Sequence, residues 1–179
     1  MPHHRRLLVV ASLVVAALFS TVPAIAGPPL LCFPFDTGGA PSLPMSGTGW
    51  RAIDPGYDVS RLVADTVRLL APPAPVIARM ETMRRATIYA AAHPKIASLL
   101  LDTLERRAAT KDANAPQAIF DFGYLAETYK QAKWMFAAPV NGLDAIDGSV
   151  WVMKAYALQR DPSMQYAAQL IKGDAPPVK

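Results

Sequence analysis

The stretch PQAIFDFGYLAETYKQAKWMF, residues 116–136, decides the fold class expected for this chain of 179 residues. Its apolar positions recur at spacings of three and four, at Ile119, Phe122, Ala126 and Tyr129. That period places them on one face of an α-helix. Pro116 stands where a proline opens a helix, because the first helical position needs no N–H donor. The stretch therefore predicts a helix from Pro116 to about Phe136, with an apolar face turned toward a core.

The same helical period continues on both sides of this stretch. Five further helices are expected, two before it from the turn at Asp58 and from Pro75, a third from Pro94, and two after it, the last opened by Pro162. Asp residues and prolines at their starts are typical of helix N-termini. Because the connections are short, neighbouring helices are expected to be antiparallel. The fold class predicted is all-α, with about six helices over residues 58–172 and a flexible tail over 173–179.

Two of these helices carry sharper expectations. The helix from Pro75 is expected to place Glu81 within reach of Arg84 and Arg85, on the side opposite its apolar face. The helix after Gly142 is expected to turn one apolar face inward. That face comprises Ile146, Val150, Met153 and Ala157.

Residues 27–57 have a different composition from the helical region. Six prolines and six glycines stand among these 31 positions, which argues against a helix or a long strand. Seven large apolar residues are nevertheless present, too many to leave in water. They are Leu30, Leu31, Phe33, Phe35, Leu43, Met45 and Trp50. We expect an extended strap, residues 27–57, lying across the helical body.

The first 26 residues have the three parts of a secretory signal peptide. A short basic start with Arg5 and Arg6 is followed by an uncharged apolar run and by Ala24-Ile25-Ala26. We expect cleavage before Gly27 and a periplasmic or extracellular protein. The alternative is an uncleaved membrane anchor, since 20 residues from Leu7 are just long enough to span a bilayer.

Charge and composition then narrow the partners. Arg5 and Arg6 leave with the signal, so the net charge of +4 falls to +2. A nearly neutral chain is not typical of nucleic-acid binding, and we expect no nucleic-acid partner. Contact with a membrane is expected only if the signal stays uncleaved. The expected partner is another envelope protein.

One segment resembles a known repeat. Residues 154–162, KAYALQRDP, place a small residue and a leucine shortly before Asp161-Pro162. This order is similar to the closing part of a tetratricopeptide repeat, and Phe122-Gly123 with Ala126 resembles the first helix of such a repeat. The resemblance implies stacked helical hairpins and a binding groove, and it implies no catalytic residue. The alternative is an unrelated bundle with similar hairpins, since Thr128 interrupts the 34-residue period.

Few residues could carry chemistry. Outside the expected signal there is one histidine, His93, and one cysteine, Cys32. A zinc site or a c-type haem needs more of these ligands, so no metal and no cofactor are expected. Cys32 is interpreted as a small apolar residue in the strap; a disulfide dimer through Cys32 is the alternative. Asp36 is interpreted as part of a turn.

The aromatic residues of the stretch at 116–136 are too many for one apolar face. We expect part of them to line a binding surface made by Tyr124, Tyr129 and Trp134. The function expected is therefore non-enzymatic binding or scaffolding in the bacterial cell envelope. The alternative is a small enzyme or ligand carrier with a pocket between strap and helices, using Cys32, His93 or Asp36.

Overall fold

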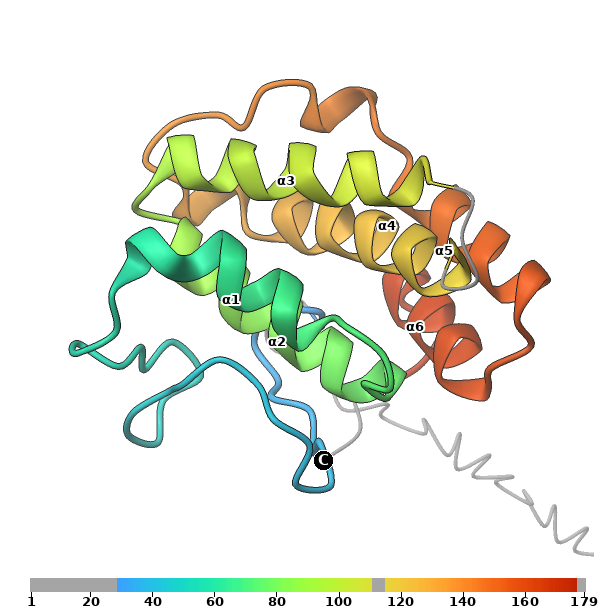
Figure 1. The fold of residues 1–179 in the computed structure, drawn as a ribbon, viewed down its shortest axis with the longest axis horizontal. Coiled ribbons are helices and arrows are strands. Elements are labelled where there is room, and N and C mark those ends of the chain that lie inside the picture. Colours follow the sequence, from blue (N-terminus) through green and yellow to red (C-terminus); the bar gives the residue numbers. More distant parts are fainter. Residues whose placement is uncertain (1–28, 111–114, 177–179) are drawn as a thin grey trace, which may run out of the picture.

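The computed structural model describes residues 29–110 and 115–176 as one helical body. Six α-helices follow one another along the chain (Figure 1): α1 Leu62–Leu69, α2 Val76–Ala90, α3 Pro94–Ala108, α4 Ala115–Gln131, α5 Gly148–Leu158 and α6 Pro162–Lys172. The described ranges contain no strand, only an isolated bridge between Met45 and Ile53. The predicted all-α fold with six helices is therefore confirmed. The expected signal, residues 1–26, lies outside the described residues.

The helix ends follow from local sequence. Asp147 caps α5, its side chain accepting a hydrogen bond from the backbone N–H of Val150, and Asp161 caps α6 in the same way through Ser163 N–H. Gly173 ends α6 with a φ of 78°, a left-handed conformation that suits glycine.

The helix α4 is shorter than predicted. It ends at Gln131, and a 3₁₀ turn over Lys133–Met135 follows in place of the continuous helix expected to about Phe136. The tighter turn brings the ring of Phe136 back onto Tyr129, with ring centroids 5.1 Å apart. Packing of Phe136 on the core therefore accompanies the end of the helix.

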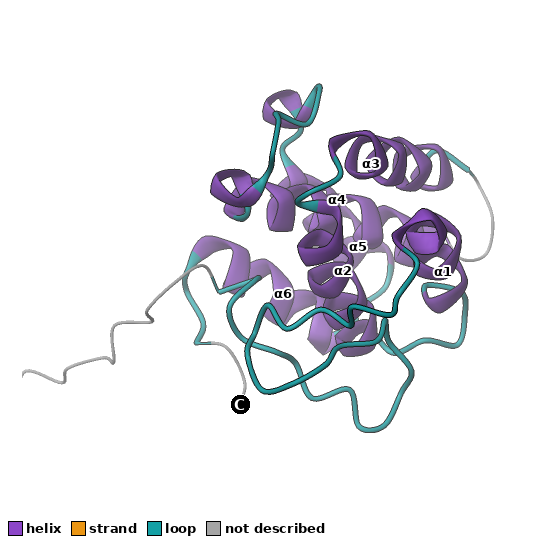
Figure 2. Ribbon diagram, turned by 90° about the vertical axis from the view of Figure 1, so that its left-hand side faces the viewer, coloured by secondary structure: helices purple, strands orange, loops and turns teal. Residues whose placement is uncertain are grey.

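The helix α2 lies at the centre of the molecule. It contacts α1, α3, α4 and α6, and thirteen of its fifteen residues are buried. Met80 and Met83 on its apolar face lie in the core. The opposite side, with Glu81 and Arg84, is buried as well, because residues 29–57 cover it. Figure 2 shows these residues as loops running beneath the helices.

The apolar side chains of the strap provide part of the core. Leu30, Leu31, Phe35 and Leu43 are all buried. Backbone bends at the strap's glycines, such as Gly38 with a φ of 61°, let the chain change direction without leaving this surface. The strap is thus part of the packed body rather than a solvated leader.

The helix α5 uses a different face from the one predicted. Val150 is 60% exposed and Met153 41% exposed, whereas Gly148, Val152 and Ala155 are buried. The cause is a close crossing with α4. A Cβ atom on Gly123 would lie 2.6 Å from the carbonyl oxygen of Gly148, and one on Gly148 would lie 2.3 Å from that of Gly123. The two backbones touch through glycine, so the small residues set the buried face.

Candidate functional site

A saturated charge cluster, Glu81 with Arg84 and Arg85, lies between α2 and the strap. The Glu81 carboxylate is fully buried and accepts four hydrogen bonds. Two come from Arg84, at 2.7 and 2.8 Å, one from Arg85 Nε at 2.6 Å and one from the Phe35 backbone N–H at 3.0 Å. Burial acts to raise the pKa of Glu81, but Arg84, the Phe35 N–H and Arg85 together hold it below its ordinary value.

The same helix grips the strap through main-chain atoms. Arg84 Nη1 donates to the carbonyl oxygens of Leu31 and Trp50, at 3.1 and 2.9 Å. Three further side chains bond the strap backbone in this way. Arg85 donates to Leu43 O and Tyr89 donates to Pro44 O. Gln131, on α4, accepts a hydrogen bond from the Leu30 N–H. Both carboxylate oxygens of Glu81 are used, either on the Phe35 N–H or on the two arginines that bond the strap. We therefore interpret this cluster as structural.

A second buried charge pair joins α2 to α4. Arg79 Nη1 donates to Asp121 Oδ2 at 2.7 Å, and each side chain is 1% exposed. Unlike Glu81, Asp121 is not saturated, because its Oδ1 is buried and no group within residues 29–110 and 115–176 is hydrogen-bonded to it. Burial raises the pKa of Asp121 to about 6, although Arg79 and Arg107 act to lower it. Incompletely paired buried groups with a shifted pKa are typical of functional sites.

A pocket of about 300 Å³ opens beside this pair. Arg79 lines it from α2, Gln117 from the start of α4, and Gln159 and Asp161 from the turn between α5 and α6. The turn at 72–75, which contains three prolines, also lines the pocket. Sequence reasoning did not identify this site, because Arg79 and Asp121 are 42 positions apart and neither stands in a motif.

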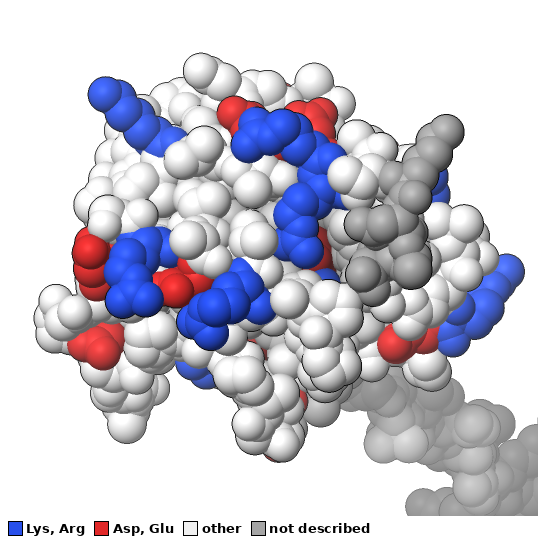
Figure 3. Space-filling model, in the orientation of Figure 1, with Lys and Arg blue, Asp and Glu red and all other residues white. Residues whose placement is uncertain are grey.

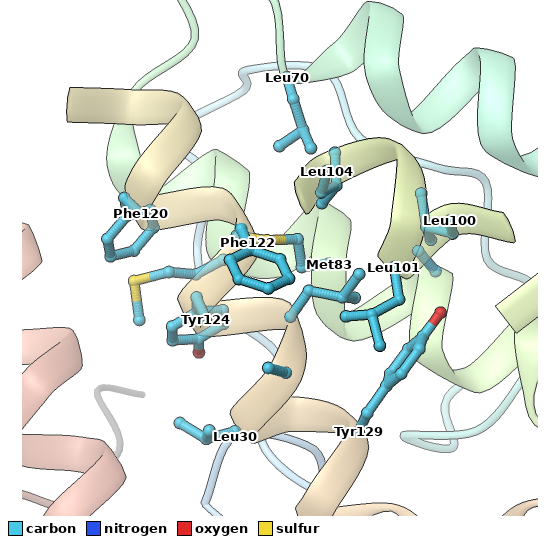
Figure 4. Close-up of a cluster of buried hydrophobic side chains, with 14 of the residues drawn as sticks. Leu30, Leu70, Met83, Leu100, Leu101, Leu104, Phe120, Phe122, Tyr124 and Tyr129 are labelled. Carbon is cyan, nitrogen blue, oxygen red and sulfur yellow. The ribbon is translucent and has the colours of Figure 1, made fainter. Parts of the chain in front are cut away.

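The predicted binding residues do not come together on one surface. Tyr124 and Tyr129 are both fully buried, and Figure 4 shows them within the cluster of apolar side chains that also contains Met83 and Leu101. The Tyr124 ring stacks on Phe120 at 5.4 Å, and the Tyr129 hydroxyl donates to Ala97 O at 3.3 Å. Trp134 alone reaches solvent, with 61% of its surface exposed.

Trp134 has other neighbours than those expected. Its ring packs edge to face on the ring of Trp50, a strap residue, with the two ring centroids 6.3 Å apart. The guanidinium of Arg51 lies 5.0 Å from the centroid of Trp50 and 5.8 Å from that of Trp134. Arg51 has no carboxylate partner within the residues described. We call Trp50, Arg51 and Trp134 the tryptophan patch.

The other residues singled out are scattered. Cys32 is a free, half-buried thiol. Burial raises its pKa, although Arg84 and Arg51 act to lower it, which favours the unreactive thiol over the thiolate. His93 is exposed at the start of α3, and in the described part of the chain no hydrogen bond joins it to Cys32.

Asp36 forms the predicted turn, its Oδ1 accepting from Gly38 N–H at 2.9 Å. It also lines a pocket of about 330 Å³ between the strap and the N-terminus of α6. Phe35, Ile77 and Pro162 make this pocket mainly apolar. Asp36 thus lines a pocket between strap and helices, whereas Cys32 and His93 do not line it.

The surface carries both signs of charge. In Figure 3, basic side chains have acidic neighbours over much of the visible face. Across residues 29–110 and 115–176, no group of three His, Cys, Asp or Glu side chains is placed to hold a metal ion. The same ranges hold no helix with the length and apolar character required to cross a membrane.

No family model, no curated protein and no solved structure matches the chain.

Proposed function

We propose that this protein is an exported, non-enzymatic binding protein of the bacterial cell envelope, and that it holds a partner protein through the tryptophan patch. The observation that carries the proposal is the pair of indoles around the unpaired guanidinium of Arg51. Tryptophan and arginine are the residues most enriched at the centres of protein interfaces.

The patch also defines the partner's chemistry. Trp134 offers a large exposed apolar ring, and Arg51 offers a cation that no carboxylate in the described ranges neutralises. The complementary surface is an acidic side chain next to an apolar one. A carboxylate bound to Arg51 would gain a charge-assisted hydrogen bond, while its apolar neighbour would cover the indole of Trp134.

Two further features support binding without chemistry. The raised pKa of Cys32 disfavours a cysteine nucleophile. Successive helices pack as neighbours, from α4 through α5 to α6, which accords with the tetratricopeptide-like hairpins that we propose for this part of the chain. Export rests on the signal-like sequence of residues 1–26.

Site-specific photo-crosslinking in cells tests the proposal. A photoreactive amino acid at position 134 should capture one protein species in the periplasmic fraction, and the substitution Arg51→Glu should abolish that capture by charge repulsion. Position 158 is the matched control, since Leu158 is 59% exposed, close to the 61% of Trp134. Equal capture from position 158, or capture that survives Arg51→Glu, would contradict the proposal.

A further inference from the structure

We propose that the pocket beside Arg79 is a binding site for a small uncharged molecule that carries a carboxamide-type group. The carbonyl oxygen of this group accepts a hydrogen bond from Arg79, and its N–H donates to Gln117. The pocket lies between α2, α4 and the α5–α6 turn. The tryptophan patch lies on other elements, so this inference does not depend on the proposed protein partner.

The donor in the pocket is the guanidinium of Arg79. Its Nε donates to Ala74 O at 3.1 Å and its Nη1 to Asp121 Oδ2 at 2.7 Å. These bonds hold the guanidinium plane in place at 1% exposure of the side chain. Nη2 is left without a partner among the described residues. Because Arg79 lines the pocket and this N–H group has no acceptor in the described part of the protein, the nitrogen can donate to an oxygen of a ligand.

The acceptor is the side-chain oxygen of Gln117. Its Nε2 donates to Gln159 Oε1 at 2.7 Å, which fixes the direction of the amide. Its Oε1 is buried and has no hydrogen-bond partner among the residues that the structure describes. A ligand N–H therefore finds an oriented acceptor on the same pocket wall that carries Arg79.

The balance of charge indicates an uncharged ligand. Arg79 is already neutralised by the carboxylate of Asp121. A second carboxylate, Asp161, lines the pocket and caps α6 through one of its oxygens. An anionic ligand would be repelled by Asp161, whose charge no further cation lining the pocket balances. An ammonium group has only N–H donors, so it could not accept a hydrogen bond from Nη2 of Arg79. Unmet hydrogen-bonding capacity, rather than unmet charge, is what the pocket offers.

The size and walls of the pocket complete the ligand class. About 300 Å³ is at the small end of ligand-binding cavities. Pro72, Pro73 and Pro75 add apolar surface to the lining of the pocket. Such a space fits a compact amide or lactam with a short apolar part.

Titration of the isolated protein, followed by NMR of its backbone amides, tests the inference. Acetamide and 2-pyrrolidinone are the probes, and acetate and ethylammonium are the charged comparators. We expect both amides to shift the signals of Ala74, Val76 and Gln117 in a saturable way, with the charged compounds binding more weakly by about tenfold or more. Comparable shifts from acetate, or none from either amide, would overturn the inference.

The variant Gln117→Ala removes the acceptor without touching the buried ion pair. It should weaken 2-pyrrolidinone by about tenfold or more, the value expected for leaving a ligand donor unpaired. Gln165→Ala is the matched control, since Gln165 lies on α6 and bonds only the Tyr156 hydroxyl. Unchanged binding to Gln117→Ala, in a protein whose other signals are unshifted, would contradict the assignment of Gln117.

Discussion

Two buried charge clusters stand on the same helix, α2, and they differ in how completely their hydrogen bonds are made. The Glu81 carboxylate receives four donors from Arg84, Arg85 and the strap backbone. The Asp121 carboxylate receives one hydrogen bond from Arg79, and its other oxygen is buried with no partner in the described part of the chain. Both are as buried as side chains can be, so burial alone does not tell a structural cluster from a candidate site.

The difference shows in the pKa of the two carboxyl groups. That of Glu81 is lowered and that of Asp121 is raised to about 6, although each faces at least one arginine. Enough hydrogen-bond donors outweigh the cost of burial at Glu81, whereas too few donors at Asp121 leave its pKa raised. An incomplete network next to a pocket is the feature worth testing for binding, whereas a complete one points to stability.

Among the substitutions that test this comparison, Glu81→Gln should cause the largest loss of stability. The amide keeps the shape but removes the charge, which leaves Arg84 buried without a counter-ion. Breaking a buried ion pair in this way costs about 3–5 kcal/mol in the free energy of unfolding. Urea denaturation measures that loss, and limited proteolysis should show faster cleavage within residues 30–57.

Asp144→Asn is the matched control for this substitution. Asp144 is paired with Lys133, but its side chain is 80% exposed, and exposed pairs contribute little, about 0–1 kcal/mol. If Glu81→Gln cost no more than Asp144→Asn, the cluster would not hold the strap.

The dependence of stability on pH should have opposite signs at the two carboxyl groups. The folded protein binds a proton at Asp121 more tightly than the unfolded chain does, because the pKa rises from 3.8 to about 6. Asp121 therefore stabilises the fold most below pH 4, and this contribution is lost as the pH rises toward 6. Glu81, whose pKa is lowered from 4.5, contributes above that value and loses its contribution in acid.

Asp121→Asn isolates the first of these effects. The stability of the wild type relative to this variant should fall by about 2–3 kcal/mol between pH 4 and pH 7. Urea unfolding at both pH values gives the difference directly. If the stability of the wild type relative to the variant stayed constant or rose between pH 4 and pH 7, the hydrogen bonds of Asp121 would offset its burial as fully as those of Glu81 do.

The smallest expected effect is that of Ser42→Ala. The Ser42 hydroxyl is 3.1 Å from that of Thr82, a neutral contact between the strap and α2. Removing it should cost about 1 kcal/mol, well below the charged cluster. Thermal unfolding compares it with Ser149→Ala, which removes an exposed hydrogen bond to Asp147. A loss as large as that of Glu81→Gln would mean that the strap's stability is spread evenly over its contacts.

The sequence predicts the helices well because their limits are local. Periodicity, capping by Asp147 and Asp161 and helix-opening prolines each act within a few positions. The buried face of α5 could not be predicted this way, since the inward pattern expected for Val150 and Met153 is overridden by contact of Gly148 with Gly123, 25 positions away. A glycine has no hydropathy signal that shows how closely another backbone approaches.

The candidate sites were less predictable for the same reason. Glu81, Arg84 and Arg85 have the spacing of a solvated helix face, and only the strap's position shows that they are covered. Tyr124 and Tyr129 have the composition of a binding surface but fill the core. The sequence does carry a signal for the neighbours of Trp134, because Trp50 and Arg51 are the only adjacent pair of an indole and a guanidinium in the strap.

The grip of α2 on main-chain atoms has a consequence for how this protein can change. Carbonyl groups are the same whatever side chain a residue carries, so the hydrogen bonds to the carbonyls of Leu31, Leu43 and Trp50 do not depend on the chemistry of those side chains, although Leu31 and Leu43 are also needed in the core. Exposed strap positions such as Arg51 are thus free to vary over evolutionary time while the path of the strap stays fixed. The helices and the path of the strap can thus stay fixed while the exposed side chains of the strap, and with them the binding specificity that we propose, change.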